Sequence, residues 1–137
     1  MTMPPRPSIQ RLASEGLITL RFGIVGIAAT LTHAAVVTLL IETTALDPRL
    51  ANAIAFCMAF LVSFNGHFHW TFPKEAPARQ ALWRFLLIAL LGFGMNTLLL
   101  SILLDGGILP ETIAALVSIL AVPATTFLAS RLWGFRN

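Results

Sequence analysis

The sequence predicts an all-α fold, an integral membrane four-helix bundle built as two helical hairpins that repeat in parallel. Charged residues make up only 11% of the 137-residue chain, whereas soluble domains carry about 25%. Four long apolar runs are almost free of charge, and nearly all Lys and Arg residues lie on one side of them. An internal repeat relates the two halves of the chain. This composition excludes soluble enzymes, and the scattered basic residues do not favour a nucleic-acid partner.

Residues 1–16 precede the first apolar run. Pro4, Pro5 and Pro7 favour disorder at the start. Ser8 is suited to cap a short amphipathic segment that lies in the membrane interface before the first span. The apolar run that follows is too long for the core of a signal peptide, so we expect this segment to be retained.

A helix needs about 20 apolar residues to cross a hydrocarbon core of about 30 Å. Four stretches meet this requirement within a single domain of residues 17–135, at about residues 17–41, 50–70, 82–104 and 113–133. Short turns around Asp47 and around Gly106 join the spans into two hairpins. A middle loop, residues 71–81, joins the hairpins.

The charges predict the orientation of these spans. The side that carries both termini and the middle loop holds eight of the nine basic residues, whereas the other side holds Arg49 with four acidic residues. By the positive-inside rule, both termini and the middle loop are cytoplasmic. Trp70, Trp83 and Trp133 fall at the same face, where indole rings favour the headgroup level.

The repeat has an offset of 63 residues. It aligns Arg21–Phe22 with Arg84–Phe85, Glu42 with Asp105, Ala51 with Ala114, Phe64 with Phe127, Trp70 with Trp133 and Phe72 with Phe135. Because each half is one hairpin of the same orientation, the pseudo-twofold axis is expected along the membrane normal.

Polar side chains in the spans are the first candidate site. His33 and Asn96 are equivalent in the repeat and lie near mid-membrane, and with Asn52 and Asn65 they form the predicted polar groove. Two interpretations remain open, namely interhelical hydrogen bonds that only pack the bundle, or contact with a substrate headgroup. Under the second interpretation, His33 could alternatively act as a proton-sensitive switch.

Small residues accompany the polar groups on two spans. The second span has a stripe of Asn52, Ala55, Ala59, Ser63 and Gly66, and the fourth span has one of Ala114, Ser118, Ala121, Thr125 and Ala129. Such stripes favour tight packing of hairpins or of two protomers, and they are equally compatible with the wall of a groove.

A second candidate site lies at the cytoplasmic face. Arg21 and Arg84 begin the two hairpins at the same depth, and His67 and His69 end the second span. Cationic and imidazole groups at the interface suit an anionic lipid headgroup. The alternative is ordinary anchoring by positive charge.

No catalytic or metal site is predicted. The sequence has no phosphate-binding loop, no acidic residue deep in a span, and no set of nucleophile, base and orienting group. Cys57 stands alone and is expected to be a small buried hydrophobe. We therefore expect no enzyme activity, no cofactor and no metal.

Four segments carry a resemblance to a known family. Residues 21–26 read RFGIVG, Ala51–Asn52 opens the second span, residues 63–72 end in Trp70-Thr71-Phe72, and Arg84–Phe85 opens the third span. From about Leu20 to Phe135 the chain resembles the GtrA-like family of small four-helix bacterial membrane proteins. It departs from that family at His33, where an acidic or amide residue is frequent, and around His67 and His69, where Asn and Arg are frequent.

The resemblance implies a place in the bacterial cytoplasmic (inner) membrane. It also implies flipping of a polyprenyl-phosphate-linked sugar for cell-envelope polysaccharide synthesis, beside a membrane glycosyltransferase. A scaffold for such a glycosyltransferase is the main alternative. A small drug exporter fits poorly, because such exporters depend on a membrane-embedded carboxylate. Since four helices enclose little volume, contact with membrane lipids and with further copies in a homo-oligomer is expected.

Overall fold

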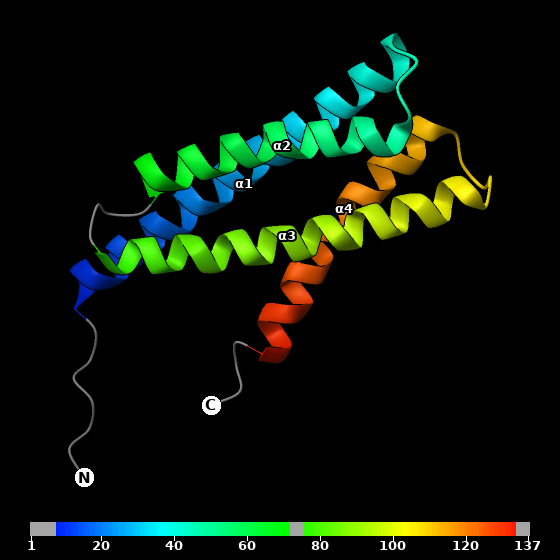
Figure 1. The fold of residues 1–137 in the computed structure, drawn as a ribbon. Coiled ribbons are helices and arrows are strands. Elements are labelled where there is room, and N and C mark those ends of the chain that lie inside the picture. The colour runs from blue at the N-terminus through cyan, green and yellow to red at the C-terminus, as the bar shows by residue number, and fades with distance from the viewer. Residues whose placement is uncertain (1–7, 72–75, 134–137) are drawn as a thin grey trace.

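The computed structural model describes residues 8–71 and 76–133, and within them it confirms the all-α fold, a bundle of four helices without strands (Figure 1). The helices are α1 (Ile9–Thr43), α2 (Pro48–Gly66), α3 (Ala76–Asp105) and α4 (Glu111–Trp133). A π-helical turn, η1 (His67–Thr71), extends α2. The disorder predicted for residues 1–7 lies outside the described residues, as do residues 72–75 of the middle loop.

Local signals in the sequence explain where the helices begin. Ser8 caps α1, since its hydroxyl accepts a hydrogen bond from the backbone N–H of Arg11 at 3.3 Å. Asp47 caps α2 in the same way through the N–H of Arg49 at 2.9 Å, and Pro48 follows in the first turn. The segment before residue 17 is helical and continuous with the first span.

The helices have the length and surface of membrane spans. Among the described residues, Ile9–Thr43, Pro48–Thr71 and Leu86–Asp105 are each long and apolar enough to cross a bilayer, and a shorter apolar stretch, Glu111–Val122, begins α4. Large apolar side chains cover the outside of the bundle, such as Leu91 at 72% exposure and Leu120 at 66%. Water does not tolerate such a surface, so the chain is a membrane protein.

The helices pair as predicted. α1 packs chiefly against α2, and α3 against α4. The turns of the two hairpins lie at the same end of the molecule (Figure 1), so the hairpins have the same orientation. We call this end the acidic end, after Glu42, Asp47, Asp105 and Glu111, and the opposite end, with Arg21 and Arg84, the basic end.

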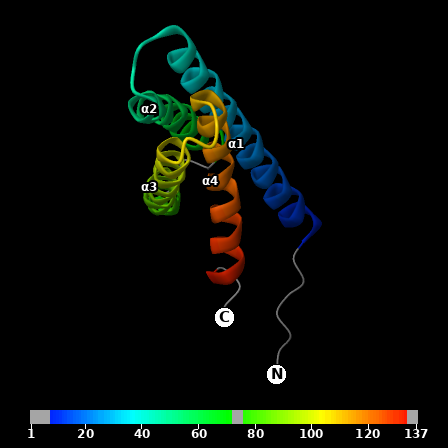
Figure 2. The same cartoon turned by 90° about the vertical axis from the view of Figure 1, so that its right-hand side faces the viewer.

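The two hairpins meet mainly through α1 and α4, and more lightly through α2 and α3. Figure 2 shows α2 and α3 on one side of the bundle and α1 and α4 on the other. Towards the basic end, α1 and α4 diverge in both views. The hairpins are therefore closest to each other towards the acidic end.

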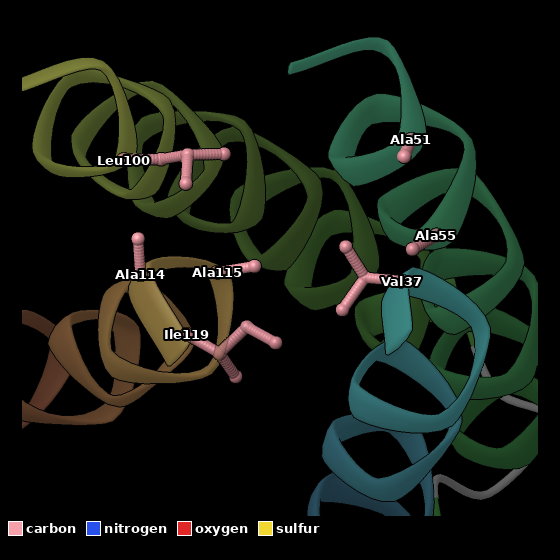
Figure 3. Packing of buried hydrophobic residues seen from close by; sticks show 7 residues of the cluster. All are labelled: Val37, Ala51, Ala55, Leu100, Ala114, Ala115 and Ile119. Atoms are coloured by element: carbon pink, nitrogen blue, oxygen red, sulfur yellow. The ribbon is translucent and has the colours of Figure 1, made fainter. Parts of the chain in front are cut away.

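The apolar core lies in the halves of the helices near the acidic end (Figure 3). Its members are Val37, Ala51, Ala55, Leu100, Ala114, Ala115 and Ile119. Val37 corresponds to Leu100, and Ala51 to Ala114, at the repeat offset, so four of the seven core residues form two equivalent pairs. Alanine allows helix backbones to approach closely, and such contact is the main source of helix association in lipid.

One prediction about the core is wrong. Cys57 is exposed on α2, although we expected it to be buried. At 100° per residue, Cys57 lies on the side of the helix opposite Ala55 and Ala59, which are buried. Its side chain therefore lies on the outer surface of the bundle.

Candidate functional site

A chain of hydrogen bonds crosses the centre of the bundle and takes one side chain from each helix. His33 on α1 contacts Asn52 on α2, with Nε2 and Oδ1 at 2.9 Å. The Asn52 amide donates to Oδ1 of Asn96 on α3 at 2.6 Å. The Asn96 amide donates to the hydroxyl of Ser118 on α4 at 3.1 Å, and Ser118 donates to the Ala115 carbonyl at 2.7 Å. We call His33, Asn52, Asn96 and Ser118 the polar chain.

The polar chain is buried inside the bundle. Asn52, Asn96 and Ser118 are fully buried, and His33 is 6% exposed. Since Asn52 Oδ1 can only accept, the proton of a neutral His33 ring lies on Nε2. A buried polar group is costly unless it is paired, and here the pairs run in one direction from donor to acceptor. These are the interhelical hydrogen bonds that one of the two interpretations predicted.

Asn65, which we grouped with this groove, does not join the polar chain. It is exposed near the end of α2, and its amide donates to the Leu61 carbonyl of its own helix at 2.8 Å. Ser118, in contrast, is a member that sequence reasoning placed only in a small-residue stripe, as a packing residue or part of a groove wall. Its position in the small-residue stripe of the fourth span was the available signal.

Thr97, the residue after Asn96, carries unused hydrogen-bonding capacity. Its Oγ1 is buried and has no hydrogen-bond partner among the described residues. Other threonines in the spans, Thr30 and Thr32, donate to the carbonyl four residues earlier. A buried hydroxyl that departs from this pattern is an unsatisfied polar group inside the bundle.

At the basic end, Arg21 is fixed against the end of the second span. Its Nη1 donates to the Trp70 carbonyl at 3.2 Å, and its guanidinium lies 5.5 Å from the centre of the Trp70 ring. This cation–π contact leaves Arg21 partly exposed at the membrane surface. His69 and Arg84 are exposed. These three side chains are accessible to an anionic group.

His67 points inward instead. It is 1% exposed, its ring stacks on Phe22 with centres 4.5 Å apart, and its Nδ1 lies 3.1 Å from the Thr71 hydroxyl. His67 still has α-helical backbone geometry, and its N–H donates to the carbonyls of Ser63 and Phe64. It therefore extends the buried stripe of α2 by one step beyond Ser63. Thr71, at the end of the π-helical turn, is buried beside it.

At the acidic end, two contacts tie the hairpins together. Arg49 on α2 donates to Ser101 Oγ at 3.1 Å and to Asp105 Oδ1 at 2.5 Å, both on α3. Thr112 on α4 donates to the Glu42 carboxylate on α1. The repeat relates Arg49 to Thr112 and Glu42 to Asp105, so the contacts are symmetric in position although one is charged. Sequence reasoning missed both, and their signal was the pairing of polar residues at the helix ends.

The described residues contain no group of three His, Cys, Asp or Glu side chains that could share a metal ion. The chemistry of the site is hydrogen bonding at mid-membrane and cationic contact at the basic end.

A protein-family model described as the GtrA/DPMS transmembrane domain matches residues 21–135. No curated protein and no solved structure gives a significant match. The family match begins at Arg21 within α1 and extends over the other three helices.

Proposed function

This chain belongs to the GtrA/DPMS transmembrane-domain family, and from that premise we propose that it flips a polyprenyl-phosphate-linked sugar across the bacterial cytoplasmic membrane. The product would serve cell-envelope polysaccharide synthesis or modification. Membership of this family supports a role with glycosyl carrier lipids. The proposal adds that the protein moves such a lipid from one leaflet to the other.

The observation that carries the proposal is the polar chain. Buried amides in a membrane bundle are expensive to maintain and commonly mark a path for a polar substrate. Asn52 and Asn96 each offer a donor and an acceptor, which can exchange their present partners for sugar hydroxyls. Thr97 adds a hydroxyl that is not yet committed.

The basic end supplies the entry for the phosphate. Arg21, His69 and Arg84 are accessible there, and a guanidinium can bind two phosphate oxygens at once. The sugar would pass between the hairpins, which diverge at this end (Figure 2), while the prenyl tail stays in lipid. With synthesis on one face and consumption on the other, the gradient drives the movement, and the chain needs neither a cofactor nor catalytic chemistry.

We place both termini and the middle loop in the cytoplasm, because eight of nine basic residues lie on that side. A homo-oligomer and a membrane glycosyltransferase are the expected partners. Labelling of single cysteines near each terminus in a Cys57→Ser background tests the orientation. Reaction with a reagent restricted to the periplasm would contradict it.

The direct test of the function is reconstitution. Purified protein in liposomes should move a fluorescent polyprenyl-phosphate hexose between leaflets faster than protein-free liposomes, as measured by quenching of the outer pool. Heat-treated protein is the control. An unchanged rate, also after addition of the cognate glycosyltransferase, would overturn the proposal.

A scaffold for a glycosyltransferase is the second candidate. It is favoured by the fact that every member of the polar chain already has a partner within the bundle. His33→Leu and Asn96→Leu variants separate the two functions. If the protein is a scaffold, the folded variants still support the glycosyltransferase. If it is a flippase, the same variants lose transport of the lipid-linked sugar.

A further inference from the structure

Four phenylalanines form a continuous aromatic ladder along α2. Phe56, Phe60, Phe64 and Phe68 follow one another at steps of four residues, and their neighbouring ring centres lie 6.2, 5.9 and 6.0 Å apart. The rings of Phe64 and Phe68 are almost parallel, at 5°. We call these four residues the Phe ladder.

The Phe ladder connects the two candidate sites. At its inner end, Phe56 stacks on Phe93 of α3 at 4.3 Å and lies edge-on to His33 at 6.4 Å, which begins the polar chain. At its outer end, Phe68 is 45% exposed and contacts the ring of His69 at 5.0 Å. The neighbouring Trp70 binds Arg21. The ladder therefore leads from the basic end to the polar chain.

The length of the ladder fits such a path. At 1.5 Å per residue, the helix rises about 18 Å between Phe68 and Phe56, which is more than half of a hydrocarbon core of about 30 Å. Phe56, Phe60 and Phe64 are half-buried, and Phe68 at the outer end is exposed.

Packing alone does not require these rings. Lipid-facing positions elsewhere in the chain are filled by aliphatic residues such as Leu61, Leu87 and Leu91. In the second hairpin, the repeat places Ile119, Pro123, Phe127 and Arg131 at the positions of the ladder. The ladder is therefore a feature of the first hairpin and not of the repeat.

An aromatic face is suited to a sugar ring. The face of a phenyl ring carries partial negative charge, and a hexopyranose presents a patch of weakly positive C–H groups on one side of its ring. Contact between them shields the sugar from hydrocarbon without demanding hydrogen bonds. Such contacts are similar at every step, so they permit sliding.

We propose that the Phe ladder is the binding track for the sugar ring of the lipid-linked sugar, from the phosphate site at the basic end to the hydroxyl-binding groups of the polar chain. This inference rests on the proposed function, and it assigns the sugar rather than the prenyl tail to these rings. The charge at the outer end supports the assignment, because the sugar is attached to the phosphate that Arg21 and His69 would bind.

The test is binding of two lipids to the purified protein in nanodiscs, followed by the change in Trp fluorescence. The probes are a polyprenyl-phosphate hexose and the same polyprenyl phosphate without sugar. The variant Phe60→Leu/Phe64→Leu keeps the apolar volume but removes two flat faces, and it spares Phe56, which packs on Phe93. Phe60→Tyr/Phe64→Tyr is the matched control, since it keeps the faces.

We expect the Leu variant to bind the hexose lipid about tenfold more weakly than wild type, to bind the sugar-free lipid as wild type does, and to retain the wild-type melting temperature. Equal weakening for both lipids would assign the ladder to the prenyl tail and overturn the inference. Unchanged binding of the hexose lipid would also overturn it.

Flux in liposomes separates this inference from the proposed function. Wild-type protein that binds the hexose lipid through the ladder but does not move it would refute flipping and leave the track intact. Wild-type protein that flips the lipid, together with a Leu variant that flips it equally fast, would refute the track alone.

Discussion

The two hairpins share a scaffold and differ in chemistry. Equivalent positions supply four of the seven core residues, since Val37 matches Leu100 and Ala51 matches Ala114. In contrast, the Phe ladder occurs in the first hairpin alone, and the equivalent positions of the second hold Ile119, Pro123, Phe127 and Arg131. Repetition thus accounts for part of the core and for the paired arginines at the basic end, whereas the Phe ladder lies where the halves have diverged.

The polar groups show the same contrast. His33 and Asn96 are equivalent, yet one is an imidazole and the other an amide. His33 contacts one member of the polar chain, Asn52, whereas Asn96 contacts two, Asn52 and Ser118. At the acidic end, the same relation pairs Arg49 with Asp105 in one contact and Thr112 with Glu42 in the other. The predictions below test how much each difference matters.

The largest effect is expected at Asn52, where the hairpins join through the polar chain. Asn52→Leu leaves the His33 ring and the Asn96 carbonyl oxygen without partners in a fully buried place. Two unpaired buried groups should lower the free energy of unfolding by about 3 kcal/mol, measured by SDS titration in mixed micelles. Asn65→Leu is the control, since Asn65 is exposed and bonds within its own helix. Equal stability of the two variants would contradict a structural role for the chain.

The next effect is at Gly66, whose counterpart in the second hairpin is Ala129. A Cβ at Gly66 would lie 2.8 Å from Val25 Cγ1, closer than atoms pack. Gly66→Ala should therefore lower the free energy of unfolding by about 1–3 kcal/mol, and adding Val25→Ala should recover part of the loss. Gly23→Ala, which meets nothing within 4 Å, is the control. An unchanged free energy of unfolding for Gly66→Ala would contradict the close packing of Gly66 against Val25.

A smaller effect should distinguish the two contacts at the acidic end. Arg49→Gln removes an exposed ion pair with Asp105, and Thr112→Val removes a hydrogen bond with Glu42. We expect each to lower the free energy of unfolding by about 1 kcal/mol or less. Only the Arg49→Gln effect should shrink in high salt. Equal salt dependence would mean that the two contacts are electrostatically alike.

The smallest effect is expected at the basic end. Arg21→Lys keeps the charge but loses the planar contact with Trp70, and it should cost about 0.5 kcal/mol in the free energy of unfolding. Arg84→Lys, at the exposed counterpart, should be neutral. Thermal melting monitored by Trp fluorescence measures both, and an equal shift would show that Trp70 contributes nothing to the placement of Arg21.

Much of the fold follows from the sequence, because helices in lipid satisfy their backbone groups locally. Long apolar runs and two short turns were enough to predict the hairpins, and the repeat related His33 to Asn96, which both contact Asn52 in the structure. The start of α1 also followed from the capping side chain of Ser8, whereas Asp47 was predicted as a turn and its capping of α2 came from the structure.

The remaining features depend on which side of each helix faces the centre of the bundle, and amino-acid composition does not determine this. His67 is buried next to Thr71 where the π-helical turn begins, and no sequence pattern we used predicts that turn. Asn65 and Cys57 were placed from depth alone and face away from the polar chain and the core. The Phe ladder was visible as a spacing of four residues, but its link to His33 required the position of α1.

Transport by folded polar-chain variants tests the central claim most directly. The initial rate of polyprenyl-phosphate hexose flipping would be compared for wild type and His33→Leu in the same liposomes, with equal protein insertion and with helix content checked by circular dichroism. If the polar chain carries the sugar, the variant rate falls to that of protein-free liposomes while the wild type remains fast. A folded His33→Leu protein that flips the lipid at the wild-type rate would contradict it.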